Sequence, residues 1–116
     1  MHKILVVAQE KEIAVIEEAL SQYLKQGGEL LISKTAEGGW KALMKEHPEL
    51  ALIDSAFVES EEAWLSPPTE TVFLVDKKAH SFKEVLEKPL RLQAILALCE
   101  KKGLLKPTLE NDVLPM

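Results

Sequence analysis

The chain contains five short, continuous apolar runs, and this pattern constrains its fold more than any other feature. Continuous apolar runs of this length are typical of strands that are buried on both faces of a parallel sheet. They occupy residues 4–7, 30–32, 50–53, 71–75 and 85–86. Segments with helical spacing of apolar residues lie between or after them, at 10–26, 36–46 and 89–102. The alternation predicts an α/β fold, a doubly wound five-stranded parallel sheet flanked by helices.

The predicted helices have defined apolar faces. In the first, Glu12 is expected on the polar side, and in the last, Pro89 is expected in the first turn and Cys99 in the core. The faces themselves consist of Ile13, Ile16, Leu20, Tyr23 and Leu24; of Trp40, Leu43 and Met44; and of Leu92, Ile95, Leu96 and Cys99. The third and fourth helices, which would follow Asp54 and Asp76, have room for only one or two turns each.

The length of 116 residues corresponds to one domain. We expect residues 1–103 to form it and residues 104–116 to be a C-terminal tail or linker. A net charge of −5 argues against a nucleic-acid surface. The single cysteine excludes an internal disulfide, and neither a signal peptide nor a membrane-spanning run is evident, so a cytoplasmic location is expected. His2, His47 and His80 match no metal-binding spacing.

Two charged residues are placed to meet in a crevice. Asp54 ends the most apolar run, and Lys88 precedes Pro89 after the last one. Because the carboxyl ends of parallel strands converge, we expect the two side chains to lie close together. The first run ends in Ala8-Gln9, where a metal site would need acids. Magnesium binding is therefore expected to be weak or absent.

Four segments together resemble the receiver domain of bacterial two-component response regulators, the CheY-like family. The resemblance covers residues 3 to about 102 and rests on the order and register of Lys3-Ile4-Leu5-Val6-Val7, Ala36-Glu37-Gly38-Gly39-Trp40-Lys41-Ala42-Leu43, Pro48-Glu49-Leu50-Ala51-Leu52-Ile53-Asp54 and Leu86-Glu87-Lys88-Pro89-Leu90. It implies that Asp54 is the candidate phosphoacceptor for a histidine kinase and that Lys88 contacts the phosphate.

The chain departs from the family pattern at the other site positions. The acid pair that helps bind magnesium is replaced by Ala8 and Gln9, and Glu10 is expected to face solvent rather than compensate. The hydroxyl and aromatic switch positions are occupied by Val75 and Val85. The usual Met-Pro pair is Phe57-Val58. Valine has the shape of threonine without its hydroxyl, so it packs but cannot hydrogen-bond a phosphate.

These departures indicate an atypical receiver, or pseudo-receiver, that is no enzyme and acts as a phosphorylation-independent protein–protein interaction or regulatory module. The expected partner is an effector domain, a histidine kinase or another signalling protein, and a second copy of the domain, forming a homodimer, is a further candidate. No binding to nucleic acid or to a membrane is expected. One alternative is a receiver that is phosphorylated on Asp54. Another is a regulatory domain that binds a small molecule in the crevice.

Several residues keep two interpretations at this level. Asp54 and Lys88 are either a working pair or a structural ion pair. An acid–base pair of Asp54 and Asp76 is less favoured than a solvated loop for Asp76. Trp64 is either a partner contact or local core, and His80 is a weak candidate for the crevice rim.

Overall fold

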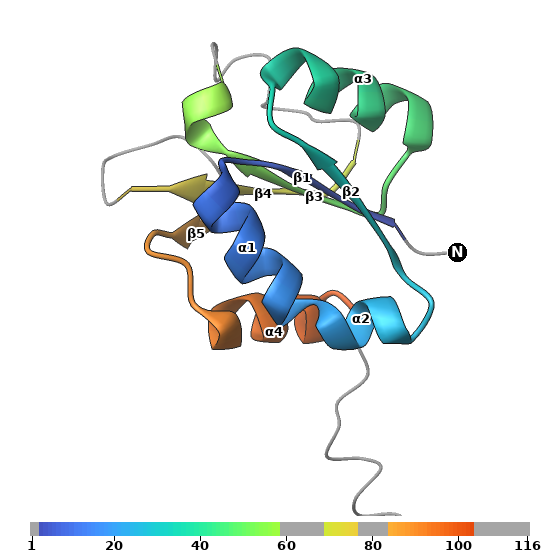
Figure 1. Ribbon diagram of the computed structural model, residues 1–116, viewed down its shortest axis with the longest axis vertical. Helices are drawn as coiled ribbons and strands as arrows, with labels where there is room; N and C mark the ends of the chain where they lie inside the picture. Colours follow the sequence, from blue (N-terminus) through green and yellow to red (C-terminus); the bar gives the residue numbers. More distant parts are fainter. Residues whose placement is uncertain (1–2, 59–68, 77–83, 104–116) are drawn as a thin grey trace, which may run out of the picture.

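The computed structural model describes residues 3–58, 69–76 and 84–103, and it contains a five-stranded parallel sheet with helices on both faces (Figure 1). The strands are β1 (Lys3–Val7), β2 (Glu29–Ser33), β3 (Leu50–Asp54), β4 (Thr71–Val75) and β5 (Val85–Glu87). The helices are α1 (Glu10–Ala19), α2 (Ser21–Lys25), α3 (Ala36–Glu46) and α4 (Leu92–Lys101), with a short 3₁₀ turn, η1 (Ser55–Phe57), after β3. The predicted fold class is confirmed.

The strand order is β2-β1-β3-β4-β5, so β1 and β3 lie in the middle of the sheet. All four pairings are parallel, and Asp54 at the end of β3 is in register with Leu74 of β4. The carboxyl ends of β1, β3, β4 and β5 therefore share one edge. This edge carries the candidate site.

The core is divided by the sheet into two clusters. One face of the sheet is covered by Ile16 of α1 and Ile95 of α4. They pack with Ile4 and Val6 of β1 and with Ala8 just after it. On the other face Leu5 and Val7 pack with Leu43 of α3. The ribbon shows the same division for the described residues, with α3 and the η1 turn on one side of the sheet and α1, α2 and α4 on the other (Figure 1).

Local signals explain the best-predicted elements. Helix α3 has the predicted bounds, because the Thr35 hydroxyl caps it by accepting a hydrogen bond from the Gly38 N–H at 3.0 Å. It ends at His47 in the left-handed conformation, with φ 50°. Strand β4 also has the predicted bounds.

The first and last helices differ from the prediction. The helix expected over residues 10–26 is interrupted at Leu20, and the change of direction keeps both Leu20 and Tyr23 in the core. The last helix begins at Leu92 rather than at Pro89. Its start is delayed because the Lys88 N–H still donates to the Val75 carbonyl at 2.8 Å, which keeps the chain extended beyond β5.

Some predicted core residues are partly exposed. Cys99 is buried as expected, but Trp40 and Met44 on α3 are 39% and 49% exposed. Leu24 and Leu92 are exposed to a similar degree. The two shortened helices, His2, Trp64, His80 and the tail from residue 104 lie outside the described residues. Within the described ranges, no helix is long and apolar enough to cross a membrane.

Candidate functional site

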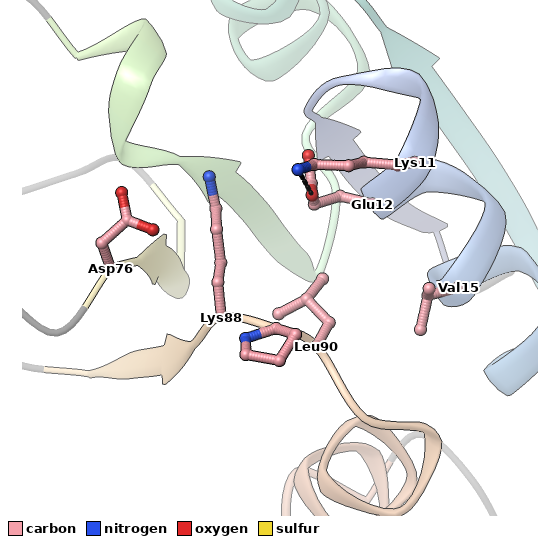
Figure 2. A pocket seen from close by; sticks show the side chains of 7 residues that line it. Lys11, Glu12, Val15, Asp76, Lys88 and Leu90 are labelled. Atoms are coloured by element: carbon pink, nitrogen blue, oxygen red, sulfur yellow. Dashed lines mark ion pairs between the residues drawn. The ribbon is translucent and has the colours of Figure 1, made fainter.

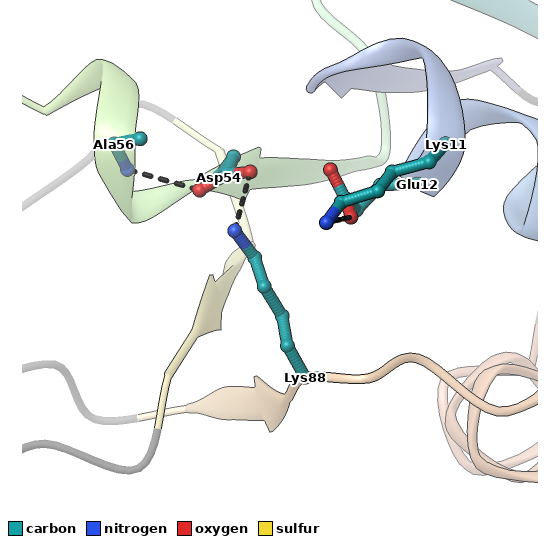
Figure 3. Close-up of polar contacts among 5 residues, drawn as sticks. All are labelled: Lys11, Glu12, Asp54, Ala56 and Lys88. Atoms are coloured by element: carbon teal, nitrogen blue, oxygen red, sulfur yellow. Dashed lines mark hydrogen bonds and ion pairs between the residues drawn. The ribbon is translucent and has the colours of Figure 1, made fainter.

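Asp54 lies at the centre of the candidate site, and both of its carboxylate oxygens have partners. Its side chain has no exposed surface. Oδ1 accepts a hydrogen bond from the backbone N–H of Ala56 at 3.0 Å, and Oδ2 lies 2.7 Å from the Nζ atom of Lys88 (Figure 3). The sharp turn of η1 directly after β3 brings the Ala56 N–H back toward the carboxylate.

Lys88 reaches Asp54 from the end of β5. Its backbone is held by the hydrogen bond to Val75, and its side chain is 18% exposed. At 2.7 Å the contact is a charge-assisted hydrogen bond as well as an ion pair. The structure thus brings together the two residues that the sequence analysis placed in one crevice.

The two positions after β1 supply no carboxylate. Ala8 is fully buried, and its N–H donates to the Ser33 carbonyl at 3.2 Å as an extension of the sheet. Gln9 is exposed and occupies the N-cap of α1, where its side chain forms no capping hydrogen bond.

The two switch positions pack as apolar residues. Val75 is 3% exposed, and Val85 is partly buried against the same cluster, on the face covered by α3. Phe57 and Val58 pack there too. These side chains fill space beside the crevice and present no hydrogen-bonding group to it.

Glu10 also contributes nothing to the crevice. Its carboxylate accepts a hydrogen bond from Lys34 at 2.9 Å on the surface, and this hydrogen bond lowers the pKa of Glu10. The expectation that Glu10 faces solvent is confirmed, since its side chain is 82% exposed.

Glu12 is the residue that the sequence analysis misplaced. It was predicted on the polar side of α1, but it is only 6% exposed and lines the crevice. The signal was present: Glu12, Ile16 and Ala19 are spaced by four and three residues, so they share one helix face. Its carboxylate lies across the crevice from Asp54 (Figure 3).

The acids around Asp54 bear on whether a metal ion could bind in the crevice. Magnesium takes near-octahedral oxygen coordination. Among the residues that the structure describes, no group of three His, Cys, Asp or Glu side chains is placed to hold a metal. Asp76 is exposed just beyond β4, and Lys88 extends between it and Glu12 (Figure 2). Asp76 is thus exposed to solvent, as the sequence analysis favoured; the loop that it was expected to start lies outside the described residues.

Comparison with solved structures identifies the architecture. A response regulator from Thermotoga maritima is similar with a TM-score of 0.64 and 23% identity, over 88% of this chain and 97% of that one. The signal receiver domain of a putative Luxo repressor protein from Vibrio parahaemolyticus has a TM-score of 0.69 and 13% identity, over 99% and 98% of the two chains. This is the receiver-domain fold.

A CheY-like receiver domain protein from Methanospirillum hungatei shares the receiver fold with a TM-score of 0.66 and 18% identity, over 88% of this chain and 93% of that one. No protein-family model matches the sequence, and no curated protein matches it. The likeness to these three structures is therefore one of fold, at sequence identities of 23% or less. In this fold Asp54 and Lys88 occupy the crevice formed by the ends of β3 and β5.

Proposed function

We propose that this receiver-fold domain acts in two-component signalling as a phosphorylation-independent module that binds protein partners. The partner is an effector domain, a histidine kinase or another signalling protein. The observation that carries the proposal is the state of Asp54. Its carboxylate is fully buried and each of its oxygens already has one partner, Ala56 or Lys88, while Ala8 and Gln9 provide no acid for magnesium.

The argument follows from the charge balance of phosphoryl transfer. Metal ions neutralise the charge that develops on the transferred group, and acids around the phosphoacceptor hold the metal. Here the one carboxylate at the end of β3 is already neutralised by Lys88. A metal ion would have to displace that lysine without help from a second acid at Ala8 or Gln9.

The absence of switch groups supports the same function. Val75 has no hydroxyl that could donate a hydrogen bond to a phosphoryl group, and Val85 has no aromatic ring. Val75 is buried and Val85 is partly buried in the cluster beneath α3, so neither position offers a polar group to the crevice. The domain then presents one surface to its partner, whatever the phosphorylation state of the signalling pathway.

The test is to incubate the protein with acetyl phosphate and magnesium and to measure the intact mass, with Asp54→Asn as the control. Calorimetry with magnesium chloride is run in parallel. We expect no phosphorylated species and no heat of binding. The double variant A8D/Q9D supplies the missing acids and is the positive control, since it is expected to gain magnesium binding.

The alternative, a receiver phosphorylated on Asp54, is favoured by the presence of the Asp54–Lys88 pair itself. A phosphorylated species that Asp54→Asn abolishes would establish this alternative and refute the proposed function. Phosphorylation that persists in Asp54→Asn would come from another residue and would leave Asp54 outside the reaction.

A further inference from the structure

The most unusual group in the crevice is the carboxylate of Glu12. Its residue is 6% exposed, and Oε1 has no hydrogen-bond partner in the described part of the chain. Oε2 lies 4.0 Å from the Nζ atom of Lys11, whose side chain is 80% exposed. This contact is a weak, solvated ion pair rather than a partner for a buried acid.

A structural role does not account for this acid. Glu12 is the third residue of α1 after the Gln9 N-cap, where a glutamate often accepts a hydrogen bond from the N-cap backbone N–H. No such capping bond closes onto Oε1, which is left without a donor. The helix dipole favours a negative charge there, but a buried carboxylate also needs direct hydrogen-bond donors. Asp54 shows the contrast, since each of its oxygens has one.

The Glu12 carboxylate borders a cavity of about 380 Å³ (Figure 2). The cavity lies between the start of α1, the end of β4 and the chain that follows β5. Lys88 and Asp76 line it on the side opposite Glu12, and an apolar wall is formed by Val15, Pro89 and Leu90. This volume lies in the range of sites that bind small organic molecules.

The charged residues that line the cavity favour a cationic ligand. Lys88 is paired with Asp54, and the ammonium of Lys11, whose side chain is 80% exposed, lies beside the Glu12 carboxylate at the edge of the cavity (Figure 2). Because Lys88 is paired with Asp54, two acids, Glu12 and Asp76, and one further cation, Lys11, line the cavity, which leaves one more acid than base. An anionic ligand would find no unpaired, enclosed cation among the lining residues.

An ammonium group fits better than a metal ion. It needs only one or two carboxylate oxygens because it brings its own three N–H donors, whereas magnesium needs an oxygen cage that the described residues do not form. The apolar wall of Val15, Pro89 and Leu90 is suited to a short alkyl chain. We propose that the crevice binds a small aliphatic primary amine, whose ammonium donates hydrogen bonds to Glu12 and whose alkyl chain packs on Val15 and Leu90.

This inference depends on Glu12 and the cavity and goes beyond the proposed function, because amine binding requires neither a free Asp54 nor magnesium. An amine would change the surface at the start of α1 and after β5. It would therefore give a phosphorylation-independent domain a ligand to respond to.

The test is a titration of the ¹⁵N-labelled protein with butylamine hydrochloride, followed by NMR. We expect saturable shifts in the first turn of α1 and at residues 88–90. Glu12→Gln is expected to weaken binding about tenfold or more, since it removes a charge-assisted hydrogen bond. Glu10→Gln, which changes an exposed acid of the same turn, is the matched control and is expected to bind as the parent does.

Two further measurements make the result decisive. Butanol has a similar shape without the charge and is expected not to bind. The thermal midpoint of Glu12→Gln is expected to be higher than that of the parent, because a buried acid without a ligand destabilises the folded protein. If Glu12 instead stabilised the fold, its replacement would lower the midpoint.

Several outcomes overturn the proposal: no saturable shift with butylamine, equal binding by Glu12→Gln, equal binding of butanol, or a lowered thermal midpoint of Glu12→Gln. Magnesium chloride is titrated separately. Saturable magnesium binding that needs Glu12 would replace the amine site with a metal site. Because the phosphorylation assay monitors Asp54, the failure of one proposal is distinguishable from the failure of the other.

Discussion

Replacing Lys88 by methionine tests how the buried pair contributes to stability. The change keeps much of the side-chain volume and leaves the Asp54 carboxylate with the Ala56 N–H as its one remaining hydrogen bond. Removing one partner of a buried ion pair costs about 3–5 kcal/mol. Since Lys88 is 18% exposed and one hydrogen bond to Asp54 remains, we expect the lower end, about 3 kcal/mol.

The measurement is urea unfolding at neutral pH. With a slope of about 2 kcal/mol/M for a domain of this size, a loss of about 3 kcal/mol moves the midpoint down by about 1.5 M. Lys11→Met is the matched control. Its side chain is 80% exposed, so a change within about 0.5 kcal/mol is expected.

The double variant D54N/K88M separates the charge from the packing. It removes the stranded carboxylate, and it is therefore expected to be more stable than Lys88→Met by about 2 kcal/mol. The reasoning is refuted if Lys88→Met costs less than about 1 kcal/mol and the double variant recovers nothing. That result would mean that water or a rearranged chain solvates Asp54 when Lys88 is absent.

Two further predictions concern packing and pH. A Cβ atom at Gly39 would lie 2.4 Å from Cγ2 of Val7. Gly39→Ala is therefore expected to lower the free energy of unfolding by about 1–3 kcal/mol in the urea assay. An unchanged midpoint would contradict the close contact of α3 with β1. Burial raises the pKa of Cys99 to about 11 and that of Tyr23 to about 12, so the folded protein retains protons that the unfolded chain loses. The free energy of unfolding is therefore expected to fall as pH rises from about 9 toward 11, and to fall less steeply with pH in Cys99→Ala. A free energy of unfolding that does not depend on pH over this range would argue against burial of both groups.

The fold was predictable because its signals are local and agree with one another. The apolar runs of β3 and β4 have no polar interruption, and Thr35 and Gly38 mark the start of α3 by a cap that sequence spacing reveals. The interruption at Leu20 was not predictable in this way. No glycine or proline marks it, and the bend arises from the tertiary need to bury both Leu20 and Tyr23.

The candidate site was predictable only in part. Strand ends locate Asp54 and Lys88, because parallel topology brings the carboxyl ends together. Glu12 was missed because a charged residue was assigned to the polar face by its chemistry, although its spacing to Ile16 placed it on the buried face. Burial of an acid depends on the cavity next to it, and the residues that form this cavity come from three separate parts of the chain.

The sheet separates the core into two clusters, one on each of its faces. Alternate residues of β1 serve opposite sides, with Leu5 and Val7 under α3 and Ile4 and Val6 under α1 and α4. Glu12 and the cavity belong to the α1 side, while the partly exposed Trp40 and Met44 are carried by α3 on the other. A substitution in one cluster therefore reaches the packing of the other through the strands that they share. A ligand bound in the cavity and a partner bound on α3 would then contact opposite faces of the sheet.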